Sequence, residues 1–367
     1  MKRLLTSPFH AISSSMHSHR AAQGVIYADM IHRAGHQIDI DFGNKANYDD
    51  YDTLMIYNGN DWSGALNLFG GMKAFAGVDR IIELSKFKGE VISVAIELPP
   101  YFDLLYERYK KLDDPNSEWH QVDWNGLQGL QTRAGWISLD QLNYYSSAYA
   151  ETLPLPRTQV IGDSHAISLY CPGTEMNSVP FKTLHGALNE GLETFLLNPM
   201  GLKEVDSYFG NIDIRHHLMR QENPSIAAKQ LAQRYVYEAA SIADKFQLDN
   251  WNIFVPLPIE DASRQVPKTG WYKGTPFFGS WKERNQIRAE FNYWLRDYAR
   301  IVTKVTIVDW TDGLENTDGQ LDFKHMEKPR SIHLSRASYP FWTGQYWNDG
   351  NGSLAKKAEG IEGFFGD

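Results

Sequence analysis

The chain of 367 residues contains a single cysteine, Cys171. One thiol cannot form an internal disulfide, and it also excludes a cysteine-rich zinc module. No apolar run reaches the ~18 residues that a membrane-spanning helix needs. The apolar stretch at the start of the chain is interrupted by Ser, Thr and His too early for a secretory signal peptide. We therefore expect a soluble protein of a reducing compartment, the cytoplasm.

An excess of positive charge is also missing. Thirty-six Lys and Arg residues face 45 Asp and Glu residues, which gives a formal net charge of −9. This balance argues against a protein whose whole surface binds nucleic acid, although a local basic groove stays open. We expect a small-molecule or carbohydrate substrate as the partner, and no membrane.

The chain is rich in aromatic side chains, with 11 Trp, 19 Tyr and 18 Phe. Hydrophobic residues make up 42% and charged residues 22%, which is typical of a globular protein with a sizeable core. Three aromatic segments, residues 119–136, 270–281 and 339–347, suit platforms for sugars or bases. Packing in the core is the other use of such residues.

Strand-like and helix-like segments alternate in the first half of the chain. Apolar residues at three- and four-residue spacing predict a helix between Ser18 and Gly35, with Ser18 as its cap. Helical spacing returns over residues 78–87. We expect strands around these segments, in residues 2–12, 36–42, 53–57 and 90–97. This alternation is typical of a parallel sheet with crossover helices.

The alternation restarts after Leu153-Pro154-Leu155-Pro156, which is a plausible domain boundary. The second half is expected to contain strands in residues 158–161, 205–214, 252–256 and 305–309, and helices over 223–246 and 281–302. We predict an α/β protein with two tandem Rossmann-like or flavodoxin-like three-layer domains and mainly parallel sheets. The predicted domains are residues 1–156 and 157–345, followed by a tail over 346–367.

The clearest chemical motif is Val160-Ile161-Gly162-Asp163-Ser164-His165-Ala166. A buried strand ends here, glycine permits a tight turn, and a serine stands where the next helix begins. Open α/β sheets place their ligands at the carboxyl ends of parallel strands. A serine becomes a nucleophile only with a base, so we expect a histidine from elsewhere in the fold.

Two distant segments complete the pattern: residues 208–217, which read YFGNIDIRHH, and residues 318–335, which contain DGQLD and SIHLS. With the Gly-Asp-Ser motif they resemble the SGNH/GDSL hydrolases, in a branch with FGEIDCRxH-like motifs. The likeness covers residues 157–340. It implies that Ser164 is the nucleophile and His333 the general base, with Asp163 in the same site. It also implies an oxyanion hole made by the Ser164 amide, Gly186 or Gly191, and Asn211.

The residue that orients the base is left open by the sequence. The family commonly has an acidic residue three positions before the histidine, and here that position is Arg330, which has no lone pair to offer. Asp322 stands three residues before His325, which makes a second Asp/His pair. Asp213 is a further candidate orienter. A protein that reuses the scaffold without hydrolysis is therefore an alternative.

A segment of the first half is similar to phage DNA β-glucosyltransferases. It comprises residues 50–58, which read DYDTLMIYN, and residues 68–71, which read LFGG. The resemblance implies a Rossmann-like half of a sugar-nucleotide transferase. Candidate ligand-binding residues here are Asn58, Gly59, Gly70 and Gly71, because glycines allow a close approach of the backbone to a ligand. No dinucleotide or P-loop motif is present, and a surface loop is the competing interpretation.

Other candidate ligand-binding residues lie at predicted strand ends. Hydroxyl, imidazole and guanidinium groups at a helix start suit a phosphate or carboxylate, and a solvated capping loop is the plainer alternative. These candidates are Ser15, His17, His19, Arg20, Glu97, His165 and Arg215. The spacing of the histidines does not favour a metal, and we assign none.

Three classes of function follow from these patterns. The leading one is an SGNH-type serine esterase or acyltransferase that acts on a carbohydrate or modified-polymer ester, with no cofactor. The second is a glycosyltransferase-like enzyme that binds a nucleotide sugar. The third is a non-catalytic binding module, suggested by Arg330 in the acidic position.

Overall fold

The computed structural model contains two compact units, each built on its own parallel sheet. The units are Met1–Ala148 with Gly344–Asp367, and Tyr149–Thr343. The structure describes residues 1–7, 24, 26–28, 30–31, 36–41, 46–57, 78–94, 106, 118–137, 157–170, 174–179, 181–197, 199–260, 266, 273–326, 332–335 and 338–339. The predicted boundary at Leu153–Pro156 and the predicted tail over 346–367 lie outside this part.

The first unit has five parallel strands in the order β2-β1-β3-β4-β5. The strands are β1 (Arg3–Thr6), β2 (Asp39–Asp41), β3 (Thr53–Ile56), β4 (Glu90–Val94) and β5 (Gly135–Ile137). The helices are α3 (Val78–Lys86) and α5 (Trp124–Arg133), with short 3-10 turns η1 (Tyr48–Asp50) and η3 (Glu118–Gln121). Helical residues also occur at Gly24, Ile26–Ala28 and Met30–Ile31, inside the predicted 18–35 helix.

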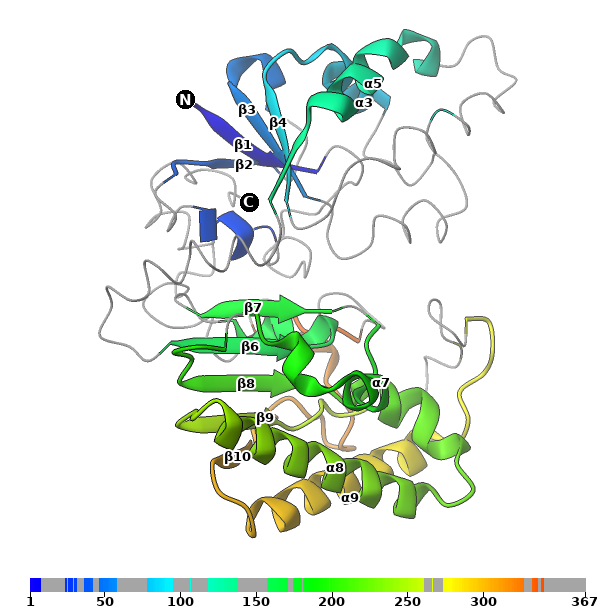
Figure 1. Cartoon of the computed structure of the whole chain (residues 1–367). Helices are drawn as coiled ribbons and strands as arrows, with labels where there is room; N and C mark the ends of the chain where they lie inside the picture. The colour runs from blue at the N-terminus through cyan, green and yellow to red at the C-terminus, as the bar shows by residue number, and fades with distance from the viewer. Residues whose placement is uncertain are drawn as a thin grey trace. The chain divides into compact units, whose positions relative to one another are not determined.

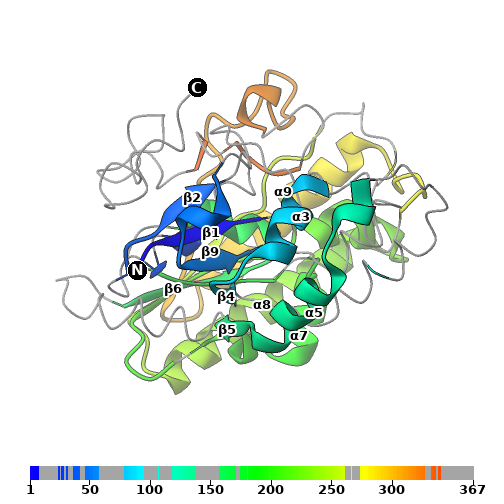
Figure 2. The same cartoon turned by 90° about the horizontal axis from the view of Figure 1, so that it is seen from above.

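The core of the first unit joins its central strands to α3 and α5. Leu54 and Ile56 of β3 are fully buried with Ile81 and Leu84 of α3 and Leu127 of α5. Both helices lie along the same face of the sheet (Figures 1 and 2). Trp119 packs into this core and stacks on Trp124. Within the 119–136 segment, the Trp119 side chain is therefore part of the core and does not form a sugar platform.

The second unit repeats the same arrangement with the order β10-β9-β8-β6-β7. Its strands are β6 (Thr158–Gly162), β7 (Glu175–Ser178), β8 (Glu204–Tyr208), β9 (Asn250–Phe254) and β10 (Val305–Val308). Its α-helices are α7 (Leu184–Glu190), α8 (Pro224–Lys245) and α9 (Trp281–Ala299). Shorter turns are η4 (Ser164–Leu169), η5 (Leu192–Phe195), η6 (Asp213–His217, a π-helix), η7 (Leu218–Arg220) and η8 (Phe323–His325).

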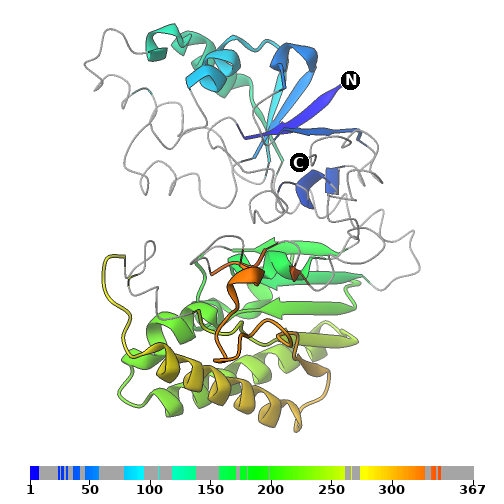
Figure 3. The same cartoon turned by 180° about the vertical axis from the view of Figure 1, so that it is seen from behind.

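Counted along the chain, both sheets have the strand order 2-1-3-4-5, the flavodoxin-like arrangement. The predicted α/β fold with mainly parallel sheets is confirmed. Helices α7 and α8 lie on the face of the second sheet seen in Figure 1. The segment that contains η8 crosses the opposite face, seen in Figure 3.

The helices of the second unit begin where their sequences provide caps. Asn223 accepts a hydrogen bond from the amide of Ile226, and Pro224 supplies a helix-compatible φ at the first position of α8. Ser280 and Glu283 form a reciprocal capping box at the start of α9. These caps fix the two long helices that pack against β8 and β9 in the core.

Candidate active site

The site lies where the strand order of the second sheet reverses direction. From β6 the chain passes first to β7 on one side and then to β8 on the other, so the carboxyl ends of β6 and β8 mark the topological switch point, where open α/β sheets place their ligands. Ser164 follows β6, and Gly210 and Asn211 follow β8. A Cβ at Gly162 would lie 2.2 Å from the carbonyl oxygen of Tyr208, so only glycine allows β6 to end this close to β8.

Ser164 and His333 form a hydrogen-bonded pair at this edge. The Oγ atom of Ser164 lies 2.9 Å from Nε2 of His333, and both side chains are half-buried. With the ring proton of His333 on Nδ1, the serine hydroxyl donates to Nε2. This distance is within the range of a nucleophile and its general base. The structure thus brings together the serine and the histidine that the sequence singled out.

His165, the residue after the serine, is held between two acceptors. Its Nδ1 atom lies 2.9 Å from Oδ1 of Asp163, and its Nε2 atom lies 3.0 Å from the carbonyl oxygen of Ile332. The same Asp163 oxygen accepts the backbone amide of His165 at 2.8 Å. Sequence analysis placed His165 among ligand-binding residues, but its side chain is 2% exposed and makes internal bonds.

The two acceptors around the His165 ring determine which of its nitrogens carry protons. A backbone carbonyl has no proton to give, so Nε2 of His165 carries one and donates it to Ile332. The Nδ1 atom then shares a second proton with the Asp163 carboxyl. Burial lowers the pKa of His165, and the charge and hydrogen bond of Asp163 oppose that shift. The His165 ring also packs against the His333 ring in a tilted arrangement, with ring centroids 4.8 Å apart.

The carboxylates predicted as orienters are engaged elsewhere. Asp213 accepts the backbone amides of Leu184 at 2.7 Å and His185 at 3.1 Å, inside the protein. Burial raises the pKa of Asp213 to about 6. Asp322 caps η8 by accepting the amide of Lys324 at 3.1 Å. Arg330, the unusual residue at the family's acidic position, lies outside the described residues.

The alternative base His325 does not face the serine. Its Nδ1 atom lies 2.9 Å from Oγ of Ser338, and its Nε2 atom is buried and has no hydrogen-bond partner in the part of the chain that the structure describes. Asp322, predicted as its partner, forms an ion pair with Lys324 instead, with 3.1 Å between Oδ2 and Nζ. The second Asp/His pair suggested by spacing is therefore not formed, because η8 turns the two side chains toward different neighbours.

Two of the predicted oxyanion donors are occupied by local structure. The Gly186 amide donates to Thr183 Oγ1 at 2.9 Å as part of the α7 cap, and the Asn211 side-chain amide donates to the Tyr208 hydroxyl. Asn211 is also fully buried. Gly191 ends α7 at a φ of 87° and is a helix terminus. In the part of the chain that the structure describes, neither the Ser164 amide nor the Gly191 amide donates to an acceptor, so these two predicted donors stay open.

Arg215, predicted to bind a ligand, forms a buried ion pair. Its Nε atom donates to Oε2 of Glu260 at 2.7 Å, and both side chains are 1% exposed. Its two Nη atoms are buried and have no hydrogen-bond partner among the described residues. The guanidinium charge contributes to lowering the pKa of His165. The residue thus acts inside the protein, close to the site.

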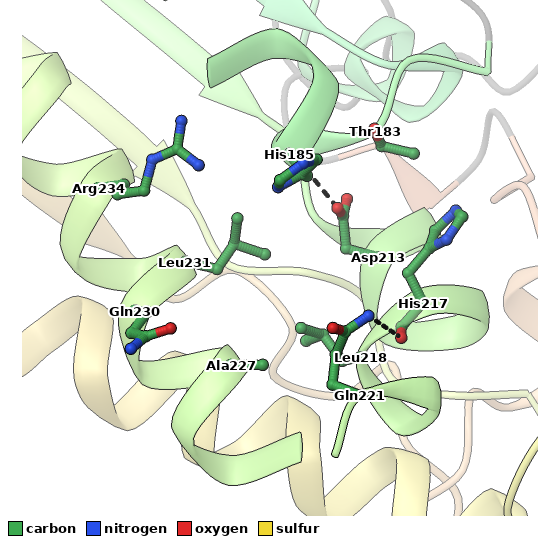
Figure 4. Close-up of a pocket in the computed structure, with 10 residues that line it drawn as sticks. All are labelled: Thr183, His185, Asp213, His217, Leu218, Gln221, Ala227, Gln230, Leu231 and Arg234. Carbon is green, nitrogen blue, oxygen red and sulfur yellow. Dashed lines mark hydrogen bonds between the residues drawn. The ribbon is translucent and has the colours of Figure 1, made fainter. Parts of the chain in front are cut away.

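A separate pocket opens on the α7 and α8 side of the same sheet edge (Figure 4). Its volume is about 380 Å³, enough for a small ligand. Asp213 lies in the wall of the pocket below α7, and Leu218 and Leu231 contribute apolar surface. Gln221 donates to the carbonyl of His217 at 3.3 Å. The complete lining comprises Thr183, His185, Asp213, His217, Leu218, Gln221, Ala227, Gln230, Leu231 and Arg234.

The candidate residues of the first half fall outside the described residues. They are Ser15, His17, His19, Arg20, Asn58, Gly59, Gly70, Gly71 and Glu97. Within the described residues, no group of three His, Cys, Asp or Glu side chains is arranged to hold a metal ion. No helix in that same part is both long and apolar enough to cross a membrane.

Sequence reasoning missed the internal role of the Asp163–His165 pair. Its signal was an aspartate and a histidine two residues apart, on either side of the serine at a strand end. Such a short spacing allows one carboxyl oxygen to bind both the amide and the ring of the histidine. The second acceptor, Ile332, lies 167 residues away and leaves no local sign.

Comparisons with known proteins add little beyond this geometry. No protein-family model and no curated protein matches the chain. Among solved structures, the chain is similar to a candidate platelet activating factor from Streptococcus pneumonia, with 16% identity and a TM-score of 0.38. The match covers 59% of this chain and 90% of that chain.

Proposed function

We propose that the protein is an SGNH-type serine esterase or acyltransferase whose nucleophile is Ser164 and whose general base is His333. The observation that carries this proposal is the 2.9 Å contact between the two side chains at the topological switch point of a flavodoxin-like sheet. The three blocks that resemble the SGNH/GDSL hydrolases support it independently. A carbohydrate or modified-polymer ester in the cytoplasm is the proposed substrate.

The chemistry proceeds in two steps. Oγ of Ser164 attacks the carbonyl carbon of the ester while Nε2 of His333 takes the hydroxyl proton. The negatively charged oxygen of the tetrahedral intermediate accepts a hydrogen bond from the Ser164 amide. The bond to the alcohol breaks, and His333 returns the proton to the departing oxygen. Water or an acceptor hydroxyl then attacks the acyl carbon while His333 takes its proton; the bond from the acyl carbon to Ser164 Oγ breaks, and His333 returns the proton to Oγ.

A fluorophosphonate probe tests this proposal directly. The serine oxygen displaces fluoride from phosphorus, which leaves a covalent adduct that intact mass and peptide mapping locate. We expect an adduct on Ser164 in the wild type and none in Ser164→Ala. Ser225→Ala, which changes an exposed serine on α8, is the matched control and should label fully. Equal labelling of wild type and Ser164→Ala would sink the proposal.

Probe labelling, together with measurements of ligand binding and ester turnover, separates the two alternatives. A nucleotide-sugar transferase predicts no adduct at Ser164, together with a rise in melting temperature with one member of a nucleotide-sugar panel. A binding module predicts no turnover of any ester and ligand binding that survives Ser164→Ala. The Ser164–His333 contact favours the esterase over both, because neither alternative needs a base beside the serine.

A further inference from the structure

We infer that His165 is a positioning residue for His333: it ties the backbone that carries the base to the strand end that carries the nucleophile. This inference rests on the proposed function. Ile332 directly precedes His333, and its carbonyl accepts the Nε2–H of His165 at 3.0 Å. His165 directly follows Ser164. One imidazole ring therefore links the two segments whose side chains meet at 2.9 Å.

The anchor of this link is Asp163, which is fully buried. Its Oδ1 atom accepts both the amide and the ring Nδ1 of His165, which fixes the ring relative to its own backbone. The Asp163 amide in turn donates to the carbonyl of Tyr208 at 3.1 Å. The position of the ring is thus set by two strands of the sheet, β6 and β8.

Only an imidazole satisfies both ends of the link. Its two nitrogens lie on different edges of a rigid ring, so one can face Asp163 while the other faces Ile332. A glutamine or asparagine carries its donor and acceptor on one terminal amide and reaches one partner. The ring also packs between two neighbours, with centroids 4.8 Å from His333 and 5.7 Å from Tyr208. Loss of the ring therefore removes the tie next to His333, while the Met326–Leu334 bridge and the bond from the Ser335 amide to the His325 carbonyl still hold the rest of the segment, and it removes no group that touches the reacting atoms.

The position of a base matters because proton transfer needs hydrogen-bond reach. A displacement of about 1 Å can cost on the order of 100-fold in rate. We expect His165→Gln to lower the rate of Ser164 labelling by about 10- to 100-fold while the probe concentration at half-maximal rate stays within about twofold. His120→Gln, on an exposed histidine of the other unit, is the control and should keep the wild-type rate.

A double-mutant cycle separates positioning from general damage to the fold. If His165 acts through His333, the His165→Gln change has no further effect in a His333→Gln background, within about twofold. A fall of equal size in both backgrounds would overturn the inference, and so would an unchanged rate in the single variant. Because the cycle is measured on Ser164 labelling, absence of labelling in the wild type refutes the proposed function and is distinguishable from these outcomes.

A measurement on the wild type covers the case in which His165→Gln does not fold. Nitrogen-15 NMR of labelled histidine reports which ring nitrogen carries the proton. We expect a His165 signal with a protonated Nε2 whose proton exchanges slowly with water, because it is buried in a hydrogen bond to Ile332. A His165 ring with its only proton on Nδ1 would contradict the link.

Discussion

Nε2 of His333 lies within 2.9 Å of Oγ of Ser164, although 169 residues separate them in the chain. No local pattern creates this contact. It depends on β6 ending beside β8 and on a segment that returns across the sheet after β10. The pair is therefore a property of the folded second unit.

The two candidate bases make different predictions. His333→Gln is expected to lower Ser164 labelling and ester hydrolysis by about 100- to 10,000-fold, because it removes the group that takes the hydroxyl proton. His325→Gln is expected to leave both rates within about threefold, since His325 faces Ser338. Initial rates with a short-chain ester, at matched folded protein, provide the comparison. The reverse order of the two effects would reassign the base.

The buried carboxyl group of Asp206 is expected to make the stability of the protein depend on pH. Burial raises its pKa to about 6, partly opposed by the hydrogen bond from Asn252. Because the folded state holds this proton more tightly than the unfolded chain, stability falls as pH rises from about 4 to about 6 and then levels.

Asp206→Asn removes this titration. Between pH 4.5 and 7 the wild type should lose about 2 kcal/mol more unfolding free energy than the variant. Urea unfolding at the two pH values measures the difference. Parallel pH profiles for the two proteins would show that Asp206 does not titrate in this range.

The Arg215–Glu260 pair is expected to matter far more for stability than an exposed pair. Glu260→Gln leaves a guanidinium charge buried without its counter-ion, which costs about 3–5 kcal/mol. Glu193→Gln disrupts the pair with Lys245, whose side chains are 57% and 44% exposed, and should cost less than about 1 kcal/mol. Chemical denaturation of both variants gives the comparison. Similar losses would mean that Arg215 finds another partner.

Gly162 is predicted to be sensitive to a single added methyl group. A Cβ there meets the Tyr208 carbonyl at 2.2 Å and Ala166 Cβ at 2.7 Å, so Gly162→Ala must push β6 away from β8. We expect a loss of about 2–4 kcal/mol together with reduced Ser164 labelling. Gly135→Ala, whose Cβ would make ordinary contact with Ile92 at 3.6 Å, is the control and should change stability by less than about 1 kcal/mol. Equal tolerance at both positions would contradict this packing.

The central strands were predictable, and so were the edge strands β2 and β10, whereas the edge strands β5 and β7 were not. The apolar runs of β3 and β6 identify strands that are buried along nearly their whole length, and β9 alternates half-buried and buried residues before a buried end. Of the two missed strands, β5 has three residues, and β7, which reads EMNS, has no apolar pattern. Pairing with a neighbour defines these two strands. Helix α5 was also missed, because two glycines dilute its apolar spacing.

The site was predictable in its residue types and not in its supporting contacts. A serine at a strand end and a histidine in a late loop follow from known chemistry, and the fold brings them together. The donors Gly186 and Asn211 could not be excluded from sequence, because a cap at Thr183 and the Tyr208 hydroxyl engage them only in three dimensions.

The shared strand order of the two sheets has a consequence for stoichiometry. Each 2-1-3-4-5 sheet has one reversal point, between β6 and β8 in the second unit and between β1 and β3 in the first. One polypeptide therefore presents two topologically equivalent edges that owe nothing to sequence repetition. A calorimetric titration of this chain therefore tests two candidate edges, and a ratio of one ligand per molecule would show that only one of the two edges binds that ligand.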